Sequence, residues 1–262
     1  MEGRTLVVGL DSPEAKSFRE YIDGAVVFHE LIPRYQLAEG KLYVEGQSSP
    51  GFLRIDRVIF HGIFDTSEDF DFLTALALWR GPCFPKARGL LDCRLRLPCL
   101  ARALEVTAFG QAARGFSVGG EPYKASQLTV AKWSNWHCGE NKHRFEGQWT
   151  PEQSTVFEPF FDGDAVRIAL IGPHAWQVRL QGEDWLHSIH HPDATYMDID
   201  KTLLEDARRL AAHFGLEVAA VDYMVTPDGS HLLEVNHVPN VTVFPEMTEA
   251  FFEVAGQWTR EQ

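Results

Sequence analysis

Apolar and polar positions alternate along two runs near the C-terminal end of the chain, on either side of the turn sequence Thr-Pro-Asp-Gly at 226–229. Proline presets φ for a turn and glycine tolerates positive φ, so residues 218–239 predict a β-hairpin. Asp222 lies within the first run, while Glu234 and Asn236 share one side of the second because they are two residues apart. One face of the hairpin would therefore present three oxygen ligands.

The periodicity elsewhere predicts short strands alternating with helices, which indicates an α/β chain of mixed α+β character. Glycine or proline follows two of the predicted helices, as expected at helix ends. The predicted strands are 5–10, 25–28, 42–45, 57–62, 128–132, 155–161, 165–171 and 176–180, and the predicted helices are 12–21, 70–79, 201–214 and 244–258.

Residues 90–104 mix basic and apolar positions. Pro98 interrupts the segment, so we expect a helix that begins near this proline rather than one long helix. Arg94, Arg96 and Arg102 are expected to form a solvated basic face, a reading that we favour over contact with a ligand.

Composition and charge limit the classes of function. The chain has 262 residues, of which 45% are hydrophobic and 23% charged, enough for a sizeable core. Its formal net charge of -13 opposes non-specific attraction to nucleic acid or anionic membrane, so bound phosphate needs a local basic site. No apolar run reaches the roughly 18 residues of a membrane span, and a signal peptide is not recognisable. We expect a cytoplasmic protein.

The four cysteines, Cys83, Cys93, Cys99 and Cys138, lack paired spacing and are expected to be reduced. Cys138 is in a polar loop and is interpreted as an incidental thiol rather than a reactive one. A homodimer is a possible assembly if some tryptophans mark an interface, although most of the seven are more simply explained as core or pocket wall.

The acids of the hairpin call for a counter-charge. At a separation of about 4 Å two carboxylates repel by roughly 4 kcal/mol at an effective dielectric near 20, so a cation or a shared proton is expected. Mg²⁺ fits best, because it takes oxygen ligands and completes its shell with water and phosphates. An ordinary hairpin with a solvated polar face remains the alternative.

Candidate cations lie earlier in the chain. Lys132 ends a predicted strand, and a polar loop with one glycine leads from it to Lys142, a weak phosphate-binding signal when taken alone. Arg167 and Arg179 lie on apolar strands and need an anionic partner, either a phosphate or a nearby acid. The histidine-rich loop at 187–193 lacks a spacing that would orient zinc ligands, so we do not interpret His187, His190, His191 and Asp193 as a zinc site.

From about residue 57 to residue 245 the order of these parts resembles the ATP-grasp superfamily, and within it the glutathione-synthetase-like and synapsin-like members. Val-Ala-Lys at 130–132 resembles the strand that carries the phosphate-binding lysine. The loop ending at Lys142 resembles the phosphate-covering loop, residues 158–163 are similar to the hinge beside adenine, and 164–167 to the strand after it. Asp222 and Glu-Val-Asn at 234–236 are the most specific match.

The resemblance implies an ATP-grasp fold in which two α+β subdomains grip ATP behind a small N-terminal α/β subdomain. It implies boundaries of 1–85, 86–157 for the lid and 158–262 for the subdomain with the metal site. The implied roles are nucleotide binding by Lys132, Lys142, Glu158, Phe160 and Arg167, Mg²⁺ binding by Asp222, Glu234 and Asn236, and catalysis by Arg179 and Lys142.

The implied activity is an ATP-dependent ligase that joins a small-molecule or peptide carboxylate to an amine, or more rarely a thiol, through an acylphosphate. One departure weakens this expectation. The family commonly has an Arg-x-Asn element where residues 185–190 read Trp-Leu-His-Ser-Ile-His. A synapsin-like ATP-binding protein with little catalysis is therefore the alternative, and a small-molecule kinase on the same scaffold is a third hypothesis.

Overall fold

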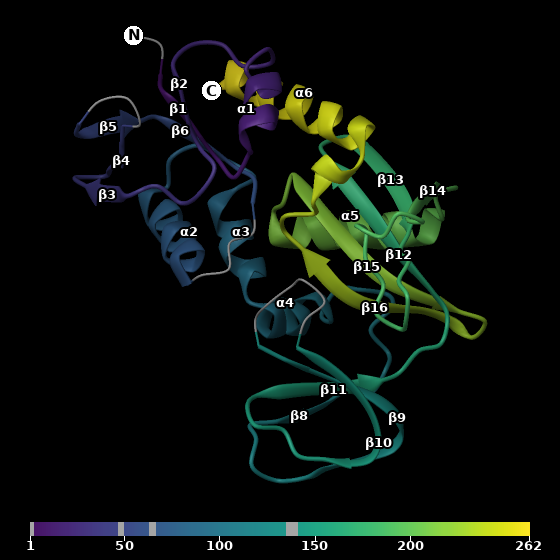
Figure 1. Cartoon of the computed structure of the whole chain (residues 1–262). Helices are drawn as coiled ribbons and strands as arrows, with labels where there is room; N and C mark the ends of the chain where they lie inside the picture. The colour runs from purple at the N-terminus through teal and green to yellow at the C-terminus, as the bar shows by residue number, and fades with distance from the viewer. Residues whose placement is uncertain (1–2, 47–49, 63–66, 135–140) are drawn as a thin grey trace.

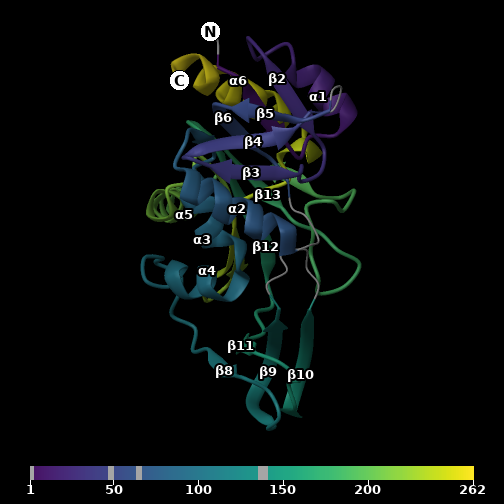
Figure 2. The same ribbon diagram turned by 90° about the vertical axis from the view of Figure 1, so that its left-hand side faces the viewer.

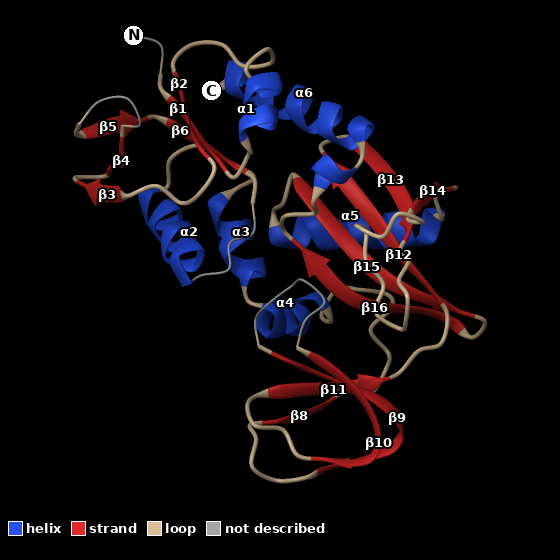
Figure 3. Ribbon diagram, viewed as in Figure 1, coloured by secondary structure: helices blue, strands red, loops and turns tan. Residues whose placement is uncertain are grey.

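The computed structural model describes residues 3–46, 50–62, 67–134 and 141–262 and arranges them in four β-sheets with helices packed around them (Figure 1, Figure 3). Both termini lie at one end of the molecule, and strands β8–β11 lie at the other (Figure 1, Figure 2). No helix among the described residues is long and apolar enough to cross a membrane.

The first part of the chain forms a parallel sheet and a small antiparallel one. The parallel sheet has the order β2 (Val26–His29), β1 (Thr5–Val8), β6 (Arg57–Phe60) and β7 (Cys83–Phe84). Helices α1 (Ser12–Phe18) and α2 (Ser67–Trp79) connect its strands. The predictions missed the antiparallel sheet of β3 (Tyr35–Ala38), β4 (Lys41–Glu45) and β5 (Phe52–Ile55), apart from its middle strand.

Two short helices follow, α3 (Ala87–Arg94) and α4 (Arg96–Ala103), and α4 starts two residues before Pro98, near the predicted position. Both helices contribute to the core that also holds α2 and α5 (Lys201–Phe214). The expected solvated basic face is wrong for Arg94 and Arg96, which are buried. Since a buried guanidinium needs an anion, Arg94 pairs with Asp69 at 2.6 Å (Nε to Oδ2).

Strands β8 (Gly115–Ser117), β9 (Tyr123–Trp133), β10 (Lys142–Trp149) and β11 (Thr155–Pro159) form an antiparallel sheet in the order β10-β9-β11-β8, here called the distal sheet. Its small core contains Ala131, Phe145 and Phe157. The distal sheet thus has its own apolar packing.

The central sheet is antiparallel and has the order β14 (Thr195–Met197), β13 (His174–Arg179), β12 (Asp164–Ile171), β15 (Val218–Thr226) and β16 (Gly229–Asn236). Helix α5 covers one face through residues such as Leu203 and Leu210. Helix α6 (Pro245–Glu261), preceded by the 3₁₀ helix η1 (Val241–Val243), packs on the other face. The predicted hairpin is confirmed as β15 and β16.

The distal sheet ends at Pro159, near the boundary expected at 157/158. Helices α3 and α4, which fall within the expected lid of 86–157, pack in the large core instead of on the distal sheet. The three-part division into 1–85, 86–157 and 158–262 therefore stays a prediction.

Candidate functional site

A cavity of about 430 Å³ lies where the distal sheet meets the central sheet. One wall comes from β9, β10 and β11, and the other from β12, β15, β16 and the segment 185–190. Its lining includes seven of the residues expected at the site: Lys132, Lys142, Glu158, Phe160, Arg167, Asp222 and Glu234. The fold therefore gathers around one cavity residues that are up to 102 positions apart.

Arg167, Asp222 and Glu234 form one row across three neighbouring strands, because Asp222 is the register partner of both other residues. Residues opposite one another in a sheet project from the same face. Arg167 donates to both oxygens of Asp222, at 2.7 Å from Nε to Oδ1 and 2.8 Å from Nη2 to Oδ2. Coulombic attraction and hydrogen bonding by Asp222 raise the pKa of Arg167, although burial, the largest single effect, lowers it.

Asn236 lies on the same face of β16 and donates from Nδ2 to Oδ2 of Asp222 at 3.1 Å. The register shifts immediately after Asp222, because Tyr223 pairs with Leu232 and leaves Leu233 as an extra residue in β16. This β-bulge brings Leu233 to the cavity beside Glu234. The expected metal ligands are thus neighbours, but Asp222 already has partners on both oxygens.

Lys132 and Lys142 are register partners on β9 and β10, so their side chains leave the distal sheet on the same side. Burial lowers the pKa of Lys142, as do the nearby charges of Lys132 and Arg96, whereas Glu234 and Asp222 raise it. The two lysines therefore carry positive charge toward the acidic row on the central sheet.

Glu158 is buried between two cations. One of its oxygens contacts Nζ of Lys132, and the other accepts from Nε of Arg114 at 3.3 Å. Arg96 lies on α4, with its Nε 3.9 Å from Oε2 of Glu234. The sequence analysis did not assign Arg114 or Arg96 to the site. Arg96 lies between two leucines, but Arg94 and Arg102 are close to it in the sequence, which favoured the expectation of a solvated basic face.

The other end of the cavity is apolar and aromatic. Phe160, Phe161 and Trp185 line it. The guanidinium of Arg144 on β10 lies 4.9 Å from the ring centre of Phe160 and 5.6 Å from that of Trp185. The contact with Trp185 connects the distal sheet to the segment between β13 and β14 of the central sheet.

Arg179, expected to be catalytic, does not reach this cavity. It is the register partner of Val166, whose side chain packs in the core on the α5 side, whereas Arg167 projects to the opposite face. The Arg179 side chain is 43% exposed and lies 3.5 Å from Asp164. A shift of one residue along a strand reverses the face, so Arg167 and Arg179 project from opposite faces of the central sheet and do not share one anionic partner.

His187 and His190 line the cavity, but the described residues contain no group of three histidines, cysteines or acids placed to hold a metal. Burial and the charge of Arg167 lower the pKa of His190, which disfavours the charged form of this histidine in the cavity. Cys83, Cys93 and Cys99 are free and buried. Cys138 and most of the expected phosphate-covering loop, 135–140, lie outside the described residues.

No protein-family model matches the sequence, and no curated protein matches it. The fold, however, is similar to solved structures over their full length. A RiPP-associated ATP-grasp ligase from Chryseobacterium gregarium, in complex with ADP and a leader and core peptide, has a TM-score of 0.65 and 11% sequence identity. The match covers 99% of this chain and 97% of that chain.

Two further structures support the same assignment. The macrocyclase MdnC from Microcystis aeruginosa, bound with precursor peptide MdnA, has a TM-score of 0.61 and 14% identity, covering 99% of this chain and 100% of that chain. D-alanyl-alanine synthetase A from Vibrio cholerae has a TM-score of 0.65 and 13% identity, covering 100% and 98%. Because all three matches extend over nearly the whole chain, this protein has the ATP-grasp fold.

Proposed function

We propose that the cavity binds ATP and that the protein is an ATP-dependent ligase joining a carboxylate to an amine. The observation that carries this proposal is the local charge. Three cations line the polar end, namely Lys132, Lys142 and Arg167, and two arginines outside the lining, Arg96 and Arg114, pair with Glu234 and Glu158. Set against the three carboxylates of Glu158, Asp222 and Glu234, these five cations leave two excess positive charges in and next to the lining, in a chain whose net charge is -13.

The shape and lining of the cavity also suit a nucleotide. Its volume of about 430 Å³ falls in the usual range for small-molecule sites, about 300 to 1,000 Å³. Phe160, Phe161 and Trp185 supply an apolar surface on which a purine can pack. We assign the base to this end and the phosphates to Lys132, Lys142 and Arg167, with Glu158 acting through its contact with Lys132.

Mg²⁺ is the expected companion of ATP, and Asp222, Glu234 and Asn236 supply the oxygen donors that it prefers. As they stand, these residues do not offer a metal site, because Arg167 and Asn236 already engage the oxygens of Asp222. We propose metal binding here only in the presence of ATP, when the phosphates give Arg167 another anion. We therefore assign no reaction step to the ion.

In the proposed reaction an oxygen of the substrate carboxylate attacks the γ-phosphorus of ATP, and the bond to the β,γ-bridging oxygen breaks to release ADP. The amine then attacks the acyl carbon, loses a proton, and expels inorganic phosphate as the amide forms. Lys142 and Arg167 would offset the negative charge on the phosphoryl oxygens during both steps. No protein nucleophile is needed, which agrees with the buried, free cysteines of the described chain.

The structural neighbours include enzymes that are bound to precursor peptides. We accordingly propose a peptide as one class of substrate, with its carboxylate, its amine or both taken from side chains or chain ends. Small carboxylates and amines, as suggested by the similarity to D-alanyl-alanine synthetase A, are the second class to be screened.

ATP binding with little or no turnover is the second candidate function. It is favoured by the position of Arg179 outside the cavity and by the absence of a cation from residues 185–190, all of which are described. Among the described lining residues Arg167 is the only arginine, and it is already paired with Asp222. Little positive charge would then be free to stabilise the transferring phosphoryl group.

Isothermal titration with ATP and a non-hydrolysable analogue, with and without Mg²⁺, tests both candidates. We expect Mg²⁺ to strengthen binding, and the strengthening to be smaller in Glu234→Gln. ADP and phosphate released only with a carboxylate and an amine present would establish the ligase. Tight binding without release would establish the second candidate, and a stable phosphorylated product a kinase. No nucleotide binding would overturn all three.

A further inference from the structure

We propose that Arg114 is a positioning residue for the nucleotide site and that it keeps the charge of Lys132 available to a phosphate. This inference rests on the proposed function. Arg114 does not line the cavity, and its side chain is only 9% exposed. It reaches the site through Glu158, which separates it from Lys132.

Glu158 forms ion pairs with both Lys132 and Arg114. Glu158 has a side chain that is 2% exposed, and each of its oxygens faces a different cation, Lys132 on one and Arg114 on the other. The trio therefore carries one net positive charge. Without Arg114, Lys132 and Glu158 would form a neutral buried pair, and the lysine would be attached to the carboxylate rather than to an incoming anion.

Hydrogen bonds to backbone carbonyl groups hold the Arg114 side chain in place. Its guanidinium also donates to the carbonyl oxygens of Leu232 at 3.0 Å and Ala112 at 3.2 Å. Leu232 in turn donates from its backbone nitrogen to the carbonyl of Phe109 at 2.9 Å. Arg114 thus lies between β16 and the segment that leads into the distal sheet, with little freedom to leave Glu158.

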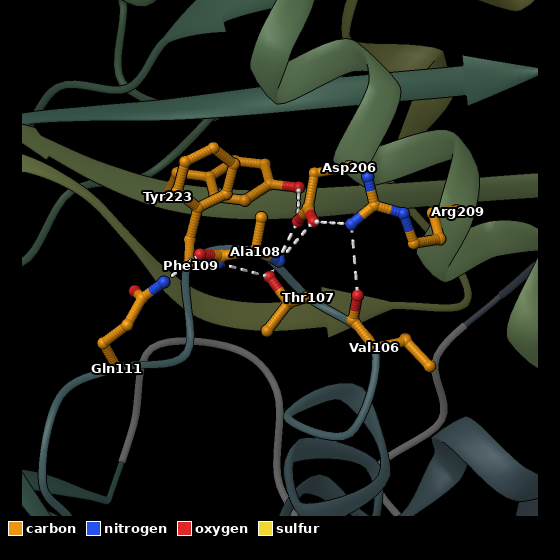
Figure 4. Close-up of polar contacts among 8 residues, drawn as sticks. All are labelled: Val106, Thr107, Ala108, Phe109, Gln111, Asp206, Arg209 and Tyr223. Atoms are coloured by element: carbon orange, nitrogen blue, oxygen red, sulfur yellow. Dashed lines mark hydrogen bonds and ion pairs between the residues drawn. The ribbon is translucent and has the colours of Figure 1, made fainter.

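The anchor of that segment is Asp206, a residue of α5 that is 1% exposed (Figure 4). Its carboxylate accepts from Thr107 Oγ1 at 2.8 Å, the Ala108 nitrogen at 2.7 Å and the Tyr223 hydroxyl at 2.9 Å. The loop before the distal sheet is thereby attached to the side of the central sheet opposite the cavity. This arrangement supports a fixed position for Arg114 rather than an adaptable surface contact.

Adenosine and ATP distinguish this role from a general contribution to folding, because adenosine has no phosphates. We expect Arg114→Met to weaken ATP binding about tenfold, as expected for one nearby charge in a partly buried site, while adenosine binding changes less than twofold. In Arg114→Met/Glu158→Gln the carboxylate that captures Lys132 is gone. The ratio of ATP to adenosine affinity should then return to within about threefold of the parent ratio.

The experiment is isothermal titration of the parent and both variants with ATP and with adenosine, accompanied by urea unfolding. If Arg114→Met lowers the affinities for ATP and adenosine equally, or if the double variant does not restore the ratio, Arg114 acts only through the fold and the inference is overturned. If Arg114→Met is too unstable to titrate, Arg114→Gln replaces it, because it removes the charge but keeps hydrogen-bond donors, and the same selective loss of ATP affinity is expected. Failure of the parent to bind ATP would instead overturn the proposed function.

Discussion

Arg167 and Asp222 lie directly opposite each other on β12 and β15 and form a two-pronged ion pair, with N–O distances of 2.7 and 2.8 Å, below the cavity. Both side chains are largely buried, at 10% and 7% exposure. The pair joins the neighbouring strands β12 and β15 of the central sheet, and under the proposed function it also determines which charges an incoming nucleotide would meet. The ion pair therefore contributes to the stability of the fold, and nucleotide binding would require Arg167 to share its charge between Asp222 and a phosphate.

Replacing Arg167 by methionine should destabilise the protein by about 3 kcal/mol, because it leaves the carboxylate of Asp222 buried without its main partner. Urea unfolding at neutral pH measures this change. Arg167→Met/Asp222→Asn should recover much of the loss, since the charge is then removed and Asn236 can still donate to the new amide oxygen. Additive losses in the double variant would contradict a direct interaction between the two side chains.

If the proposed function holds, Lys142 should make ATP affinity depend on pH. Burial lowers its pKa below the ordinary lysine value, so the charged form that attracts phosphate is lost at a lower pH than for a solvated lysine. ATP affinity should fall as pH rises from about 7 to 10, before solvated lysines deprotonate. Isothermal titration across this range, with adenosine as the uncharged reference, measures the fall.

Two variants test this assignment of the pH dependence. Lys142→Arg should keep its affinity over the whole range, because a guanidinium stays charged. Lys201→Met, which removes an exposed lysine from the start of α5, should leave the pH profile of the parent unchanged. An identical fall in Lys142→Arg would show that another group titrates.

The hairpin, the strand that ends near Lys132 and helix α5 could be predicted because each has a clear local period and a turn or stop signal. Glu234 and Asn236 could be placed on one face from their spacing alone. The role of Arg114 could not be predicted, since it depends on contacts with Glu158 and Leu232, which are 44 and 118 positions away. The contacts of Asp206 with Thr107, Ala108 and Tyr223 could not be predicted from the sequence either.

Other errors also have local causes. Strand β10 was missed because, apart from Phe145, its described side chains are exposed or half-buried, so the sequence has no apolar alternation. The catalytic role of Arg179 was implied by the resemblance and stays a prediction, but its position outside the cavity lining could not be foreseen, because nothing in the sequence fixes which face of β13 turns toward the cavity. The burial of Arg94 and Arg96 follows from packing between helices, which overrides the simple expectation that charged residues face solvent.

Asp206→Ala should lower the free energy of unfolding by about 3 kcal/mol, because the buried Tyr223 hydroxyl and Ala108 N–H lose their acceptor. Burial, followed by the charge of Asp206, raises the pKa of Tyr223, which agrees with a phenol that stays protonated and donates. Urea unfolding measures the loss. Glu205→Ala, an exposed neighbour on the same helix, serves as the control and should change stability by less than about 0.5 kcal/mol.

Tyr223→Phe removes one donor to Asp206 and leaves the others in place, so it should cost about 1.5 kcal/mol. Limited proteolysis provides a second measurement. We expect faster cleavage within 105–114 in Asp206→Ala than in Glu205→Ala under native conditions, because the segment has lost its anchor. Equal cleavage rates would show that other contacts hold the segment.

His61 should make the stability of the fold depend on pH below neutrality. It is buried after β6, with its ring centre 4.8 Å from that of Phe251, and burial lowers its pKa below the ordinary value. The unfolded chain therefore binds more protons than the folded chain between the folded pKa and the ordinary pKa of about 6.5. The contribution to stability is fully present above that ordinary value and is lost as pH falls toward the folded pKa.

Replacing His61 by leucine removes this titration, so the unfolding free energy should fall less steeply between about pH 7 and pH 5 than it does in the parent. The slope, not the absolute stability, is the test, because the substitution also changes packing against Phe251. His174→Leu, at an exposed position of β13, should keep the parent slope. Parallel pH profiles for parent and His61→Leu would mean that other groups cause the acid sensitivity, among them His29 and His231, whose pKa burial also lowers.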